Sequence, residues 1–93
     1  MVVGILTLRL MIPGAHSLKE KRQALRSNKA RLRAQYNVSV AEVDSQDLWQ
    51  MAVLGVGAVG TDRTIVESVF DSVVRLVRQS RHVQLAGAEK EFV

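Results

Sequence analysis

Hydrophobic and polar residues alternate along the first part of the chain. Residues 2–12 read VVGILTLRLMI, in which the even positions from Leu6 to Ile12 are strongly apolar and the odd positions are mixed. Alternation with a period of two is typical of a strand that turns one face toward a core. The run stops at the turn signal Pro13-Gly14, so we predict a strand over residues 2–12.

The next segment carries a narrow apolar stripe at the spacing of a helix. The stripe consists of Leu18, Leu25, Leu32 and Tyr36. Ser17 and Glu20 fit the Ser-x-x-Glu capping box, in which each residue satisfies a free backbone N–H group at a helix start. Asn37 tolerates the left-handed conformation that is common just beyond a helix end. We therefore predict a helix from Ser17 to about Tyr36, stopped by Asn37.

Two strand-like segments follow, close enough in the sequence to form a hairpin. Residues 38–44 (VSVAEVD) and residues 48–59 (LWQMAVLGVGAV) are separated by the turn residues Ser45-Gln46-Asp47. Val43 is out of phase with the other valines of the first segment. This phase change predicts a β-bulge near Val43.

A second helix and a last strand complete the pattern. A broad apolar face at helical spacing, capped by Thr61 or Asp62, predicts a helix that reaches about Ser80, and residues 82–92 predict a final strand. The order strand–helix–strand–strand–helix–strand is typical of the ferredoxin-like α+β fold (βαββαβ). In this fold two helices cover one face of a four-stranded antiparallel sheet. The length of 93 residues suits a single domain, residues 1–93.

Composition excludes several classes of protein. Apolar residues make up 47% and charged residues 24% of the chain, which is the balance of a globular protein and not of a disordered one. No apolar run approaches the ~18 residues of a membrane span, and no basic leader of a signal peptide precedes Val2. We therefore expect a cytoplasmic protein with no membrane partner. The chain has no cysteine, which excludes disulfides and thiolate chemistry.

The net charge of +4 is unevenly distributed along the chain. The predicted helix from Ser17 to Tyr36 has seven basic residues and one acidic residue, whereas the other residues include six basic and eight acidic ones. Five of the helix cations recur at intervals of three and four residues and therefore share one flank. This basic flank consists of Lys19, Arg22, Arg26, Lys29 and Arg33, with Lys21 near the helix start. Cations in the opening turns oppose the helix dipole by roughly a few tenths of a kcal/mol each.

The basic flank has two interpretations. In the functional one, these cations bind the phosphates of RNA or of a ribosomal particle, because clustered Lys and Arg attract phosphates and release counterions. In the structural one, the flank is solvated and its cations pair with Glu67, Glu89, Glu91 or the acids of a partner subunit. Cations that oppose the helix dipole without visible compensation favour a functional role for this flank. We therefore predict a non-enzymatic module that binds RNA. The alternative is a structural or protein-interaction module.

A glycine motif precedes the second predicted helix. Residues 55–60 read GVGAVG and match the dinucleotide fingerprint G-x-G-x-x-G. However, the chain is too short for a doubly wound sheet, and the helix cap follows the third glycine. We interpret these glycines as strand residues at a bend, a bulge or a close contact. A site for a small phosphorylated ligand is the alternative, and we expect no cofactor.

The remaining chemically capable residues do not form a catalytic set. His16 and His82 have no metal-ligand spacing to each other or to a carboxylate. Asp44 and Asp47 flank a turn, and turn chemistry explains both. No serine has a base and an orienting group in a recognisable pattern. We therefore expect no catalytic or metal site and no enzyme activity.

The sheet face that points away from the helices is predicted to be apolar. If Ala52, Leu54 and Val56 face the helices, a second set of side chains faces away from them. This set consists of Val3, Ile5, Met11, Trp49, Met51 and Val53. Large exposed apolar patches mark interaction surfaces, so we predict a homodimer formed through the open sheet face.

Three stretches of the chain are specific when taken together. They are SLKEKR (residues 17–22), YNVSVAEV (residues 36–43), and DLWQ (residues 47–50) with Leu54-Gly55. They resemble the YlxP-like family of small bacterial proteins, a domain family of unknown function. The resemblance covers nearly the whole chain and implies a ferredoxin-like fold. Family members are often encoded beside translation initiation and ribosome-maturation factors, which implies an RNA or ribosome partner, and the family provides no catalytic residues to carry over.

Overall fold

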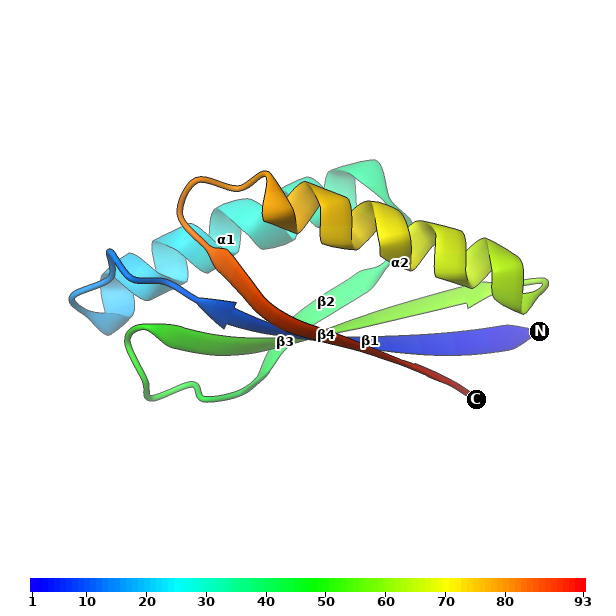
Figure 1. The fold of residues 1–93 in the computed structure, drawn as a ribbon, viewed down its shortest axis with the longest axis horizontal. Coiled ribbons are helices and arrows are strands. Elements are labelled where there is room, and N and C mark those ends of the chain that lie inside the picture. The colour runs from blue at the N-terminus through cyan, green and yellow to red at the C-terminus, as the bar shows by residue number, and fades with distance from the viewer.

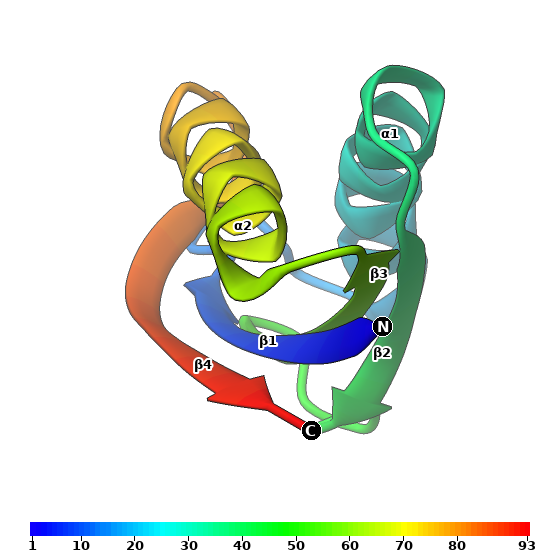
Figure 2. The ribbon, with the colours of Figure 1, turned by 90° about the vertical axis from the view of Figure 1, so that its right-hand side faces the viewer.

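The structure is a computed structural model that describes residues 1–93 as one four-stranded antiparallel sheet covered on one face by two helices (Figures 1 and 2). The strands are β1 (Val2–Met11), β2 (Ser39–Asp44), β3 (Met51–Gly60) and β4 (Gln84–Phe92). The helices are α1 (Leu18–Gln35) and α2 (Arg63–Arg78). The strand order across the sheet is β2-β3-β1-β4. The predicted ferredoxin-like α+β fold is thus confirmed.

The core lies between the sheet and the helices. The even residues of β1 and β3 point into it and face each other across the two strands, as in the pairs Leu8–Leu54 and Leu6–Val56, all of them buried. From the helix side, α2 contributes a stripe of buried apolar residues that includes Phe70. Each such large apolar side chain contributes roughly 1.5–3 kcal/mol by leaving water. Neither helix is long and apolar enough to cross a membrane.

Both helices begin at the predicted caps. Ser17 Oγ accepts a hydrogen bond from the backbone N–H of Glu20 (3.1 Å), and the Glu20 carboxylate accepts one from the backbone N–H of His16 (2.8 Å). Of the two candidates for the cap of α2, Asp62 is the one used, because its carboxylate accepts from the N–H of Ile65 (3.0 Å).

The end of α1 differs from the prediction. Asn37 does not adopt a left-handed conformation, because Ser45 is the one non-glycine residue with a positive φ. Instead, Tyr36 is already extended, with φ −132° and ψ 149°, and its N–H still bonds the carbonyl of Leu32. The chain therefore passes from the helix toward β2 without a left-handed cap.

The hairpin of β2 and β3 contains the predicted bulge. The register shifts between Glu42 and Asp44, so Val43 has no partner of its own on β3. β3 begins at Met51, three residues later than predicted, and Trp49 therefore lies in the loop before it. The Gln50 side chain donates to the carbonyls of Pro13 and Ala15, which ties this loop to the segment before α1. The assignment of Trp49 to a strand was thus wrong.

The G-x-G-x-x-G motif of residues 55–60 lies entirely within β3. None of its glycines has a positive φ, so no turn of the kind that cradles a pyrophosphate forms there. A methyl group at Gly60 would come within 3.0 Å of Val66 Cγ2, which is a close approach between β3 and α2. The interpretation of these glycines as strand residues agrees with the structure.

Candidate nucleic-acid interface

One flank of α1 and the edge strand β2 enclose a basic groove of about 500 Å³. Its lining includes four cations of α1, two apolar residues of the same helix, and two polar side chains from β2 and the loop that follows. These residues are Arg22, Arg26, Lys29, Arg33, Leu25, Ala30, Glu42 and Gln46. The 3.6-residue period of the helix aligns the four cations, and β2 supplies the second wall. We call these four cations with their walls the basic groove.

The cations of the basic groove have no carboxylate partner within the fold. The four ion pairs of the structure use Arg9, Lys21, Arg63 and Lys90 as their cations. Glu67 pairs with Arg63 (3.1 Å) and Glu89 pairs with Arg9, so neither neutralises α1. Glu91 forms no ion pair at all. The interpretation in which Glu67, Glu89 and Glu91 neutralise the basic flank therefore does not hold in this fold.

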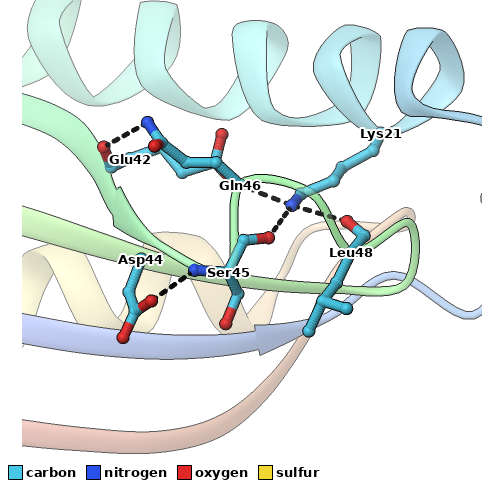
Figure 3. Close-up of polar contacts among 6 residues, drawn as sticks. All are labelled: Lys21, Glu42, Asp44, Ser45, Gln46 and Leu48. Atoms are coloured by element: carbon cyan, nitrogen blue, oxygen red, sulfur yellow. Dashed lines mark hydrogen bonds and ion pairs between the residues drawn. The ribbon is translucent and has the colours of Figure 1, made fainter.

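Lys21 is not part of the basic flank, and its assignment to the nucleic-acid site was wrong. Its side chain is only 1% exposed, because Lys21 lies on the buried stripe of α1 with Leu25 and Leu32. The side chain descends from α1 into the β2–β3 loop (Figure 3). A phosphate outside the molecule cannot reach its Nζ.

The buried ammonium group of Lys21 has three partners. Nζ donates to the carbonyls of Ser45 (2.6 Å) and Leu48 (2.7 Å), and it lies 2.8 Å from the Glu42 carboxylate (Figure 3). Two hydrogen bonds and one ion pair thus compensate an ammonium group that is removed from water. The Glu42 side chain is 16% exposed and is occupied by this ion pair, so it does not neutralise the cations beside it.

Arg33 has a structural contact as well as a place in the groove. Its Nη2 donates to the carbonyl of Val40 on the edge strand β2 (2.5 Å). Gln46 donates from Nε2 to the carbonyl of Glu42 (3.4 Å). Arg22, Arg26 and Lys29 have no hydrogen bond to the protein and keep their donors free for a ligand. Lys19 is exposed at the start of α1, outside the groove lining.

Sequence reasoning missed Glu42 and Gln46 as residues of the groove wall. Their position follows from the bulge and from the pairing of β2 with β3, which spacing along the chain does not reveal. The phase of Lys21 was a usable signal, since it precedes Leu25 by four residues and thus shares its face.

The other candidate residues remain apart from one another. His82 lines a second cavity of about 550 Å³ between the β1–α1 and α2–β4 loops, while His16 is exposed before α1. No group of three or more His, Cys, Asp or Glu residues comes together in a metal-binding arrangement. Of the predicted interface residues, Val3, Ile5 and Met11 on β1 and Met51 and Val53 on β3 share the sheet face opposite the buried core residues.

Comparison with known proteins gives a family and a fold. Residues 3–90 match the family model DUF503, described as a protein of unknown function. The chain is 33% identical over 76 residues to the uncharacterized protein YlxP of Bacillus subtilis (strain 168), a match that covers 82% of this chain and 83% of that protein. A C-terminal segment of the alpha subunit of aIF2 from Pyrococcus abyssi has a similar fold, with a TM-score of 0.54 and 18% identity. That match covers 99% of this chain and 49% of the archaeal one, so this chain spans about half of its length.

Proposed function

Because the chain belongs to the DUF503 family of proteins of unknown function, we propose its role from its own chemistry, namely that it is a non-enzymatic module that binds RNA or a ribosomal surface through the basic groove. Arg22, Arg26 and Lys29 are the principal phosphate contacts. Arg33 and Lys19 extend the row at its two ends. Lys21 acts indirectly, because it fixes the loop that carries Gln46 in the groove wall.

The observation that carries this proposal is the absence of a carboxylate partner for any cation of the groove. Like charges at helical spacing repel one another and weaken the helix that bears them. Arg22 of the groove, and Lys19 beside it, also lie near the positive end of the helix dipole. Apart from the hydrogen bond of Arg33 to Val40, no contact in the fold offsets these costs, whereas an anionic ligand would relieve both effects.

The length and chemistry of the row favour a nucleic-acid backbone over a small anion. From Arg22 to Arg33 the row extends for roughly 16 Å at ~1.5 Å per residue, a length that more than one phosphate of a strand is needed to span. The groove is lined by no aromatic side chain that could stack on a base. The proposed contact therefore positions RNA through its phosphates and does not read its sequence.

Binding of the chain to bulk ribosomal RNA and to ribosomal particles, measured at a series of salt concentrations, tests the proposal. The wild-type protein is expected to bind at low salt, with log K falling linearly against log salt by about 0.7 per phosphate contacted on a single strand. The triple variant Arg22→Glu, Arg26→Glu, Lys29→Glu is expected to flatten this slope by about two units and to weaken binding by more than ~10-fold.

A matched control separates the groove from the overall charge. The triple variant Arg75→Glu, Arg78→Glu, Arg81→Glu makes the same change in net charge with exposed cations of α2 and the α2–β4 loop. It is expected to leave the salt slope nearly unchanged, and thermal melting checks that both variants fold. The proposal is overturned if the wild-type protein does not bind RNA at low salt, or if the two triple variants lose affinity equally.

A further inference from the structure

No helix covers the sheet face opposite α1 and α2 (Figure 2), and on the central strands this face carries mainly apolar side chains. On the two central strands it carries the odd residues of β1 and β3, while their even partners are buried in the core. Ile5 is 39% exposed, Met51 43% and Val59 60%. Side chains of this kind lose contact with water when a second surface covers them, so the face is suited to association.

The charges of this face lie at its margins. Arg9 is the one charged residue among the outward positions of β1 and β3, and its guanidinium lies over Gly87 and pairs with Glu89 on the edge strand β4. The strongly basic α1 is on the other side of the sheet (Figure 2). Glu91, the partner of Ile5 on β4, adds an unpaired negative charge at the edge of this face. A polyanion therefore finds no counter-charge here, and the surface that fits the centre of the face is itself apolar.

On this face a hollow, where a residue has no side chain, lies beside apolar side chains that project from the surface. Gly57 stands opposite Ile5 in the register, and a methyl group at Gly57 would meet no atom within 4 Å. The neighbouring Ile5 and Val59 project from the same surface. A two-fold dimer needs this combination, because each copy must offer both the feature that is inserted and the feature that receives it.

The area of the face is sufficient for a dimer. The four strands have 10, 6, 10 and 9 residues, and each residue covers about 16 Å² of the sheet, at ~3.3 Å along the strand and ~4.8 Å between strands. The face therefore measures roughly 550 Å² per copy, and covering it in both copies buries about 1,100 Å², above the ~1,000 Å² that a specific interface requires.

We propose that this face binds the same face of a second copy of the chain, in a symmetric dimer that packs sheet against sheet. Ile5 and Val59 flank the hollow at Gly57, which receives a side chain of the partner, and Met51 extends the apolar surface to the other end of β3. The Arg9–Glu89 pair lies at its rim. The dimer would leave both basic grooves exposed on its outer surfaces, so it stands or falls independently of RNA binding.

Sedimentation velocity over a wide concentration range, extended to the highest soluble concentration, tests this proposal. The wild-type protein is expected to shift from 10.3 kDa toward twice that mass as concentration rises. Ile5→Asp places a charge at the centre of the interface and is expected to raise the dimer dissociation constant by at least ~10-fold. Ile65→Asp is the matched control, because Ile65 is an isoleucine of similar exposure (48%) on α2, away from the sheet face.

A second variant keeps the test decisive if Ile5→Asp fails to fold. Gly57→Val fills the hollow: its Cβ would have no atom within 4 Å in the monomer, and a β-branched residue favours the strand. It is therefore expected to fold and to dimerise at least ~10-fold more weakly. A protein that remains a monomer at every concentration overturns the proposal, and so does a dimer that Gly57→Val leaves intact.

Discussion

At the scale of single residues, Lys21 shows how a charge can change its role on folding. Its sequence context, SLKEKR, places it among cations that face solvent, yet its side chain is enclosed and holds two loop carbonyls and Glu42. Replacing one member of such a buried pair leaves the other charge and the carbonyls without partners. Among the cations at the start of α1, Lys21 thus stabilises the fold and is not available to a ligand.

Lys21→Met is expected to destabilise the protein by about 3–5 kcal/mol, because it leaves the Glu42 carboxylate and the loop carbonyls without a donor. Urea unfolding measures this loss. Lys19→Met, at an exposed position two residues earlier, is the control and is expected to change stability by less than ~0.5 kcal/mol. The double variant Lys21→Met, Glu42→Gln is expected to recover part of the loss; an additive double variant would contradict the coupling.

Gly4 makes a different kind of contact, between β1 and α2. A methyl group at this position would lie 2.5 Å from Val66 Cγ1 and 2.7 Å from Phe70 Cε2, both in the core. Gly4→Ala is therefore expected to cost about 1–3 kcal/mol in urea unfolding, since the helix must move away from the strand. Gly14→Ala serves as the control, because nothing lies within 4 Å of the added methyl group. Equal stabilities of the two variants would show that α2 adapts without cost.

At the scale of elements, the boundaries that local chemistry determines were predictable. Ser17 and Asp62 cap their helices with their own side chains, and the alternation in β1 assigns its buried face without knowledge of the fold. The boundaries that depend on distant contacts were not. β3 begins late because Lys21 and Gln50 hold the loop before it, and both reach across elements far apart in the chain.

The opening turn of α1 allows a test of the balance between stability and binding. Lys19→Glu replaces a cation at the positive end of the helix dipole by an anion, which is expected to raise stability by about 0.3–1 kcal/mol. In a domain of this size the melting temperature would rise by a few degrees, roughly 1–8 °C. The same change is expected to weaken RNA binding modestly. A drop in melting temperature would show that Lys19 has a stabilising contact within the fold.

At the scale of the whole molecule, the sequence pattern predicted the architecture but only part of the candidate site. Periods of two and 3.6 residues were enough for the order of elements and the covered face of the sheet. The row of cations was also predictable, because helical spacing alone aligns Arg22, Arg26 and Lys29. Its concave shape was not, since the opposite wall depends on a bulge in β2 and on the partners of Glu42.

The whole molecule also separates its surfaces by chemistry. The basic groove is formed along α1, which lies on one side of the sheet (Figure 2), and the apolar face is on the opposite side. Mutations in one surface are expected to leave the function of the other intact, because the buried core lies between them. Ligand binding and self-association can therefore be measured as independent properties of one small domain.

The contacts that Arg33 and Gln46 make with β2 have a consequence for aggregation. Edge strands with free backbone groups recruit strands from other molecules, and growth into a fibril requires two such edges on each molecule. On β2 the carbonyls of Val40 and Glu42 already accept hydrogen bonds from these two side chains, and the bulge interrupts the strand. An incoming strand would have to displace them, which leaves β4 as the one open edge. Edge-to-edge addition would then stop at a pair of molecules instead of continuing into a fibre.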